Sequence, residues 1–105
     1  MKKNFPLLLE GKHPDRVLEA VKHEIRKYFK RERNRVVPKG VDFWDFDCKV
    51  GLSADNAEVV RVSGVIEAVD TAAKSGAALV YVEILSKHGV RVIKAQDDQE
   101  PQQKV

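Results

Sequence analysis

The chain has 105 residues, of which 43% are hydrophobic and 33% charged, and its formal net charge is +3. This length fits a single domain, and the apolar fraction is too high for a chain that is disordered throughout. Its single cysteine excludes an internal disulfide framework and any zinc site built from several cysteines. No apolar run approaches the roughly 20 residues of a membrane span, and the N-terminus lacks the long apolar stretch of a secretory signal. We therefore expect a cytoplasmic protein with no membrane partner.

The charges are distributed unevenly along the chain. Residues 1–39 carry 12 Lys and Arg against five Asp and Glu, a net charge of +7, whereas residues 40–105 carry seven against 11, a net charge of −4. A chain polarised in this way is expected to have one basic and one acidic surface. The alternative is that Lys and Arg only solubilise a long exposed helix, as runs of charge commonly do.

The N-terminal segment predicts a strand followed by a turn. Residues 3–10 are short and apolar, and Pro6 favours an edge position or the start of the strand, because proline cannot donate a hydrogen bond to the ladder. Pro14 suits the first position of a helix, where its missing N–H costs nothing. His13, immediately before it, is a weak substitute for an N-cap residue.

The helix predicted over residues 14–33 has an apolar side and a basic side. Its apolar residues recur at helical spacing and form one stripe, namely Val17, Leu18, Val21, Ile25, Tyr28 and Phe29. Basic residues form a neighbouring row that continues into the next loop, namely Lys22, Arg26, Lys27, Lys30, Arg31, Arg33, Arg35 and Lys39. Because nucleic-acid affinity comes largely from Lys and Arg that neutralise phosphates, this row is the candidate nucleic-acid-binding site.

A β-hairpin and a second helix are predicted next. Alternation over residues 41–52 indicates a half-buried strand, with Trp44, Phe46, Cys48 and Val50 on one face and Phe43, Asp45, Asp47 and Lys49 on the other. Turn residues at 53–56 lead to a returning strand at 58–62. A helix then begins at Ser63 or Gly64 and is stopped by Gly76. In the alternative interpretation, 58–62 belongs to this second helix.

The C-terminal part predicts a strongly apolar strand over 78–85, a turn at 87–89, a further short hairpin strand at 90–95 and a disordered polar tail at 96–105. The order β-α-β-β-α-β is typical of the ferredoxin-like sandwich. We therefore predict a single α+β domain over residues 1–95, with two helices on one face of a four-stranded sheet and the other face open.

The open sheet face is the second candidate site. If the β-branched residues of the last main strand face the core, the open face presents a partly aromatic and rather acidic set, namely Phe43, Asp45, Asp47, Arg61, Tyr81 and Glu83. Exposed contiguous apolar surface tends to mark an interface, so this face is interpreted as a contact for another protein or for a second copy of the chain. The alternative is ordinary cross-strand packing, with Arg61 paired to Asp45 or Asp47.

Enzymatic chemistry finds weak support in the sequence. Asp45 and Asp47 on one strand face, with Glu83 across the sheet, form an arrangement that Mg²⁺ accepts, but this spacing is very common in strands. The three histidines are not at metal-ligand spacing, and Cys48 is expected in the core, where it acts as a small hydrophobe. No phosphate-binding glycine loop or nucleophile motif is present. We predict no catalytic residue, no metal and no cofactor.

Three strings, GKHPDRVLEAVKHEIRKYFKRER, PKGVDFWDFDCKVG and YVEIL, make the chain similar to a small family of uncharacterised bacterial proteins, mostly proteobacterial. The resemblance covers roughly residues 3–87. It implies a bacterial cytosolic protein of about this length and implies no activity and no site residue. From the residues themselves, the leading hypothesis is a non-enzymatic domain that binds nucleic acid through the basic first helix. RNA is favoured over DNA as the ligand. The alternative is a protein-interaction or homo-oligomerisation module that uses the open sheet face.

Overall fold

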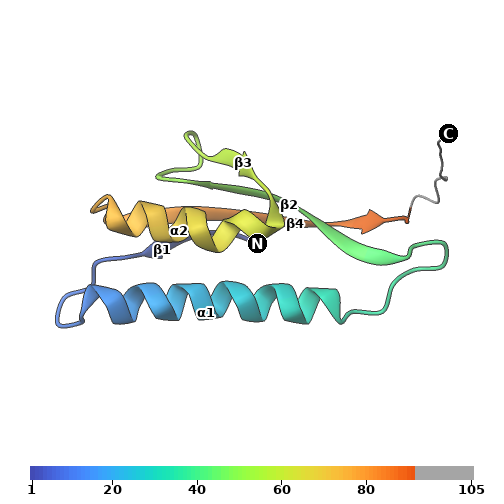
Figure 1. Cartoon of the computed structure of the whole chain (residues 1–105), viewed down its shortest axis with the longest axis horizontal. Coiled ribbons are helices and arrows are strands. Elements are labelled where there is room, and N and C mark those ends of the chain that lie inside the picture. The colour runs from blue at the N-terminus through green and yellow to red at the C-terminus, as the bar shows by residue number, and fades with distance from the viewer. Residues whose placement is uncertain (92–105) are drawn as a thin grey trace, which may run out of the picture.

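Two helices and one four-stranded sheet make up residues 1–91, the part of the chain that the computed structural model describes (Figure 1). The elements follow in the order β1 (Lys2–Pro6), α1 (Pro14–Arg33), β2 (Phe43–Gly51), β3 (Glu58–Val60), the short 3₁₀ turn η1 (Val62–Gly64), α2 (Val65–Lys74) and β4 (Leu79–Gly89). This confirms the predicted α+β class and the β-α-β-β-α-β order along the chain.

The sheet has the strand order β1-β4-β2-β3, and all neighbouring strands are antiparallel. The ferredoxin-like order, in which the first strand is internal, is not confirmed. The longest pairing joins β2 to β4, from Phe43 opposite Gly89 to Gly51 opposite Tyr81, and it fills the centre of the sheet. β1 has only five residues and ends at Pro6, so its place at the edge agrees with the preference of proline for edge strands.

One face of the sheet and both helices enclose the hydrophobic core. β1, β2 and β4 contribute Phe5, Cys48 and Val82, which are at most 3% exposed, and α1 and α2 contribute the fully buried Ile25 and Val69. The helices therefore lie on the same side of the sheet, as expected, and leave the opposite side uncovered (Figure 1).

The boundaries of several strands differ from the prediction. β1 stops at Pro6, and Leu8 and Leu9, which were expected in the strand, are exposed. Residues 58–60 form β3, so the hairpin interpretation holds and the helical alternative for this stretch is wrong, although the strand ends before residue 62. The end of β1 follows from its pairing with β4, and β3 ends where the chain enters the 3₁₀ turn η1. Neither end could be derived from local β propensity.

The turn predicted at 87–89 is wrong, because β4 continues to Gly89 opposite Phe43 of β2. The Phe43 ring occupies the place of a side chain at this glycine, since a Cβ there would lie 2.3 Å from a ring carbon. Glycine at position 89 therefore serves a close approach and not a turn. Of the predicted strand 90–95, residues 90 and 91 are not in a strand; the remainder and the predicted disordered tail 96–105 lie outside the described residues.

Candidate nucleic-acid interface

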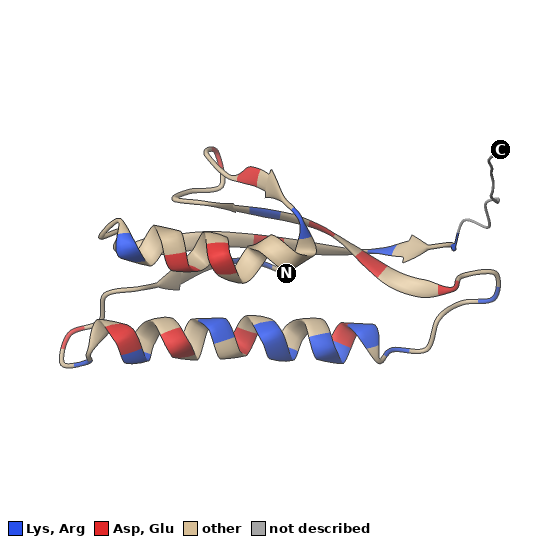
Figure 2. Cartoon of the chain, in the orientation of Figure 1, with Lys and Arg blue, Asp and Glu red and all other residues tan. Residues whose placement is uncertain are grey.

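Three cations in the C-terminal half of α1 point away from the sheet. The buried residues Val17, Val21, Ile25 and Phe29 face the core, so Arg26, Lys27 and Lys30 project from the sides of the helix that solvent reaches. All three are exposed, and within residues 1–91 none has a carboxylate within ion-pair distance. Basic residues gather in this half of the helix, while acidic residues are more frequent in the first half (Figure 2).

Local helix chemistry accounts for part of this polarity. His13 caps the N-terminus, because its Nδ1 accepts a hydrogen bond from the backbone N–H of Asp15 at 3.2 Å. This confirms His13 as an N-cap substitute. Asp15 lies in the first turn, and Lys30, Arg31 and Arg33 lie in the last turn. Both placements favour the helix dipole, so stabilisation of the helix end and a binding role are compatible uses of the same cations.

Lys22, which the sequence groups with this row, points instead to α2. Its Nζ donates to Asp70 Oδ1 at 2.8 Å and lies 3.4 Å from Glu19, and its side chain is only 14% exposed. The hydrogen bond to Asp70 raises the pKa of Lys22, and the same bond, with a second from Lys74, lowers the pKa of Asp70. The charge of Lys22 is therefore balanced inside the fold, where it links the two helices.

Three arginines at the end of α1 lie over aromatic rings. Arg31 lies 5.1 Å from the ring centre of Tyr28, Arg33 lies 5.3 Å from Phe29 and 5.7 Å from Phe46, and Arg35 lies 4.7 Å from Trp44. A guanidinium on a ring face gains cation–π attraction while its N–H groups stay available at its edge for a hydrogen-bond acceptor. The rings therefore help to orient these arginines.

Glu32 is the one carboxylate among residues 26–35, which hold six Lys and Arg. It accepts a hydrogen bond from Arg35 at 2.7 Å and one from Ser86 at 3.3 Å, and Arg31 lies 3.6 Å away. Its side chain is 12% exposed. The hydrogen bond from Arg35 is the main cause that lowers its pKa. Glu32 thus attaches the helix end to β4 and neutralises part of the arginine charge.

Trp44 lies beside this helix end. Its Nε1 donates to the backbone oxygen of Arg35 at 3.1 Å, and its ring meets His88 edge-on with 5.4 Å between ring centres. Alternation along β2 assigned it to the core, and it does lie on the helix-facing side, but it is only partly buried. Sequence reasoning missed its contact with Arg35, for which the only available signal was its place at the start of a strand.

Lys39, the last cation of the predicted row, lies in the loop between α1 and β2 and is exposed.

The open face of the sheet carries the predicted acidic residues, with a cation between them. The register sets Asp45 opposite Lys87 and Asp47 opposite Leu85. Lys87 Nζ lies 2.8 Å from Asp47 and 4.0 Å from Asp45, and the hydrogen bond to Asp47 raises the pKa of Lys87. Their partner is therefore Lys87 and not Arg61, which follows β3 at the start of η1.

The aromatic character of this face is smaller than expected. Tyr81 lies on it but is only 7% exposed. Its hydroxyl donates to Glu83 Oε1 at 2.8 Å, and this bond raises the pKa of Tyr81. Its accessible apolar side chains are Leu85 (41% exposed) and Leu79 (39%) on β4, Phe43 (37%) at the start of β2 and Val59 (79%) on the edge strand β3.

Metal and thiol chemistry find no arranged site in the described residues. Residues 1–91 contain no group of three His, Cys, Asp or Glu side chains placed to hold a metal ion. Cys48 is 2% exposed, and burial raises the pKa of its thiol to about 11. Across the same stretch, neither helix has the length and apolar character needed to cross a membrane.

Comparison with known proteins identifies the family. The model of a family of unknown function, DUF6172, matches residues 1–95, and the chain belongs to this family. No curated protein and no solved structure matches it. The match confirms the resemblance to an uncharacterised family.

Proposed function

We propose that the protein binds single-stranded nucleic acid, RNA in particular, through a basic surface at the end of α1. This basic surface comprises Arg26, Lys27, Lys30, Arg31, Arg33, Arg35 and Lys39. The observation that carries the proposal is that Arg26, Lys27 and Lys30 are exposed together with no carboxylate in ion-pair distance among the described residues. Unpaired cations on one surface are what a phosphate backbone neutralises.

A single strand suits this surface better than a duplex. Single-strand binders combine a basic track with aromatic side chains on which bases stack. Trp44 is partly exposed, lies under Arg35, and adjoins His88 at the end of the basic surface. We infer that phosphates contact the helix and that an unpaired base reaches the Trp44 ring. The proposal includes a place in the bacterial cytoplasm, where RNA is accessible.

The test is fluorescence anisotropy of labelled single-stranded RNA and of duplex DNA, titrated at several salt concentrations. Each phosphate contact to a single strand contributes a slope of about 0.7 in log K against log salt. The triple variant Arg26→Gln, Lys27→Gln, Lys30→Gln is therefore expected to reduce the slope by about 2.

The matched control is Lys2→Gln, Lys49→Gln, Arg61→Gln, which removes the same charge from exposed positions on β1, on β2 and after β3. The control variant is expected to keep most of the slope. Equal losses in both triple variants would show a general charge effect and contradict a site on α1.

A second candidate is a protein interface on the open sheet face. The specific observation is that Phe43 and Leu85 are exposed on a face that neither helix covers. Phe43 also packs on Gly89, so Leu85→Glu is the cleaner variant. If the native chain is a dimer by light scattering, Leu85→Glu is expected to make it a monomer. A native protein that remains monomeric at high concentration would remove the self-association version.

A further inference from the structure

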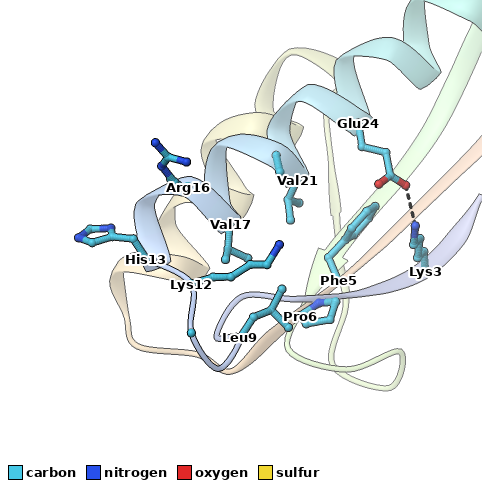
Figure 3. A pocket seen from close by; sticks show the side chains of 12 residues that line it. Lys3, Phe5, Pro6, Leu9, Lys12, His13, Arg16, Val17, Val21 and Glu24 are labelled. Atoms are coloured by element: carbon cyan, nitrogen blue, oxygen red, sulfur yellow. Dashed lines mark hydrogen bonds and ion pairs between the residues drawn. The ribbon is translucent and has the colours of Figure 1, made fainter.

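A groove of about 550 Å³ lies between β1 and the N-terminal half of α1 (Figure 3). Its floor is apolar, because Phe5 of β1 and Val17 and Val21 of α1 line it and are buried beneath it. Leu9, which is 42% exposed, forms part of its wall in the turn before the helix. A groove of this volume is in the range of small-molecule sites. It adjoins the opposite half of α1 from the basic surface and shares no residue with it.

The ends of the groove differ in charge. At one end Lys3 Nζ lies 2.6 Å from Glu24 Oε2, so each neutralises the other. From the other end Lys12 extends along the groove towards Phe5, while His13 and Arg16 point away from it (Figure 3). Among residues 1–91 no carboxylate lies within ion-pair distance of Lys12. The groove therefore holds an apolar floor with an unneutralised ammonium above it.

The N-terminus of α1 is not the source of anion recognition here. The backbone N–H of Asp15 donates to His13 Nδ1, and those of Arg16 and Val17 donate to the backbone oxygen of His13. Pro14 has no N–H to offer. Since these backbone donors are occupied, a bound anion depends on side chains, of which Lys12 is the one directed into the groove.

We propose that this groove binds a free, small amphiphilic carboxylate. The apolar body lies on Phe5, Val17 and Val21, and the carboxylate meets Lys12. Lys12 sets this orientation, because at the far end Lys3 and Glu24 neutralise each other and leave no free cation to meet a carboxylate. Burial of an apolar chain on the floor supplies most of the affinity, and the ion pair selects an acid over an alcohol of equal length.

Amide and methyl NMR during titration with octanoate, octanol and octyltrimethylammonium tests this directly. Octanoate is expected to give saturable shifts at Leu9, Val17 and Val21. Octanol is expected to bind up to about fivefold more weakly, the upper limit for an exposed ion pair, and the cation more weakly still. Equal binding of octanol and octanoate, shifts elsewhere, or no shifts would overturn the proposal. Binding to anionic vesicles without binding of free octanoate would also overturn it.

Two variants keep the test independent of folding. Lys12→Gln is expected to remove the preference of octanoate over octanol, while Lys49→Gln, the same change at an exposed lysine of β2 outside the groove, leaves it intact. Ala20→Met places extra volume in the groove from an exposed helix position and is expected to abolish the Val17 and Val21 shifts, with an unchanged circular dichroism spectrum. Retention of the octanoate preference in Lys12→Gln, or undiminished binding in a folded Ala20→Met, would overturn the assignment.

Discussion

Replacing Glu32 with glutamine separates a binding role of the helix end from a purely structural one. Glu32 is the only carboxylate among residues 26–35, and it pairs with Arg35 at 2.7 Å and with Arg31 at 3.6 Å. If these arginines serve only to hold the helix end, Glu32→Gln weakens the fold and does nothing else. If they belong to a nucleic-acid surface, the same change releases them to phosphates and strengthens binding.

The expected gain follows from the two released charges. One additional contact to a single strand raises the salt slope by about 0.7, and two raise it by about 1.4. Relative to 1 M salt, this corresponds at 0.1 M to a gain in affinity of about fivefold for one contact and about 25-fold for two. Arg35 has the shorter contact to Glu32. We therefore expect that Glu32→Gln releases at least Arg35 and raises the affinity by at least the amount given for one contact.

The assay is anisotropy of labelled single-stranded RNA at several salt concentrations, with circular dichroism to verify folding. Glu19→Gln is the matched control, because it removes one carboxylate from an exposed position in the first half of α1, 3.4 Å from Lys22. We expect the control to show only the small effect of one added net charge. If Glu32→Gln binds with the affinity and salt slope of Glu19→Gln, or more weakly, then Arg31 and Arg35 do not contact the RNA.

Further predictions concern the stability of the fold and its ionisable groups. Ile25→Ala empties a fully buried position and is expected to cost about 2–5 kcal/mol of unfolding free energy in denaturant titration, with Ile66→Ala, at a partly buried site, costing clearly less; equal costs would contradict the assigned core. The pKa values of Glu32 and Asp70 are lowered in the fold, so the stability that they contribute is complete at neutral pH and is lost as the pH falls below about 4.5. Glu32→Gln should reduce the loss of unfolding free energy at low pH. If the pH dependence of stability is unchanged in this variant, Glu32 does not form stabilising ion pairs in the fold. Because burial raises the pKa of Cys48 to about 11, its thiol should react with a disulfide reagent at pH 8 only at the rate of unfolding, and rapid reaction would show that the strand opens.

The elements and faces of the fold were largely predictable from the sequence because they depend on local periodicity. The stripe through Val17, Val21 and Ile25 defines the buried side of α1, and it lies as predicted. The alternation along β2 correctly separates Cys48 and Val50, which face the helices, from Asp45 and Asp47, which do not. A period of two or of 3.6 residues is preserved whatever the strand order.

The strand order and the individual partners could not be predicted, because they depend on residues distant in the sequence. Lys22 meets Asp70 across 48 positions, and Lys87 rather than Arg61 meets Asp47 across 40. The close approach of Phe43 to Gly89 gives the glycine a packing role, whereas the local sequence predicts a turn at this position. The candidate basic row was visible in the sequence, but the separation of Lys22 from it required the packing of α1 against α2.

The most direct test of the nucleic-acid interface is amide NMR of the isotope-labelled protein with single-stranded RNA at near-physiological salt. The chain has one tryptophan, so the indole N–H of Trp44 gives a single, assignable signal. We predict saturable shifts of residues 26–35 and of this indole signal, with little change on the open sheet face. Shifts confined to the open face around Phe43 and Leu85, or no shifts, would contradict this prediction.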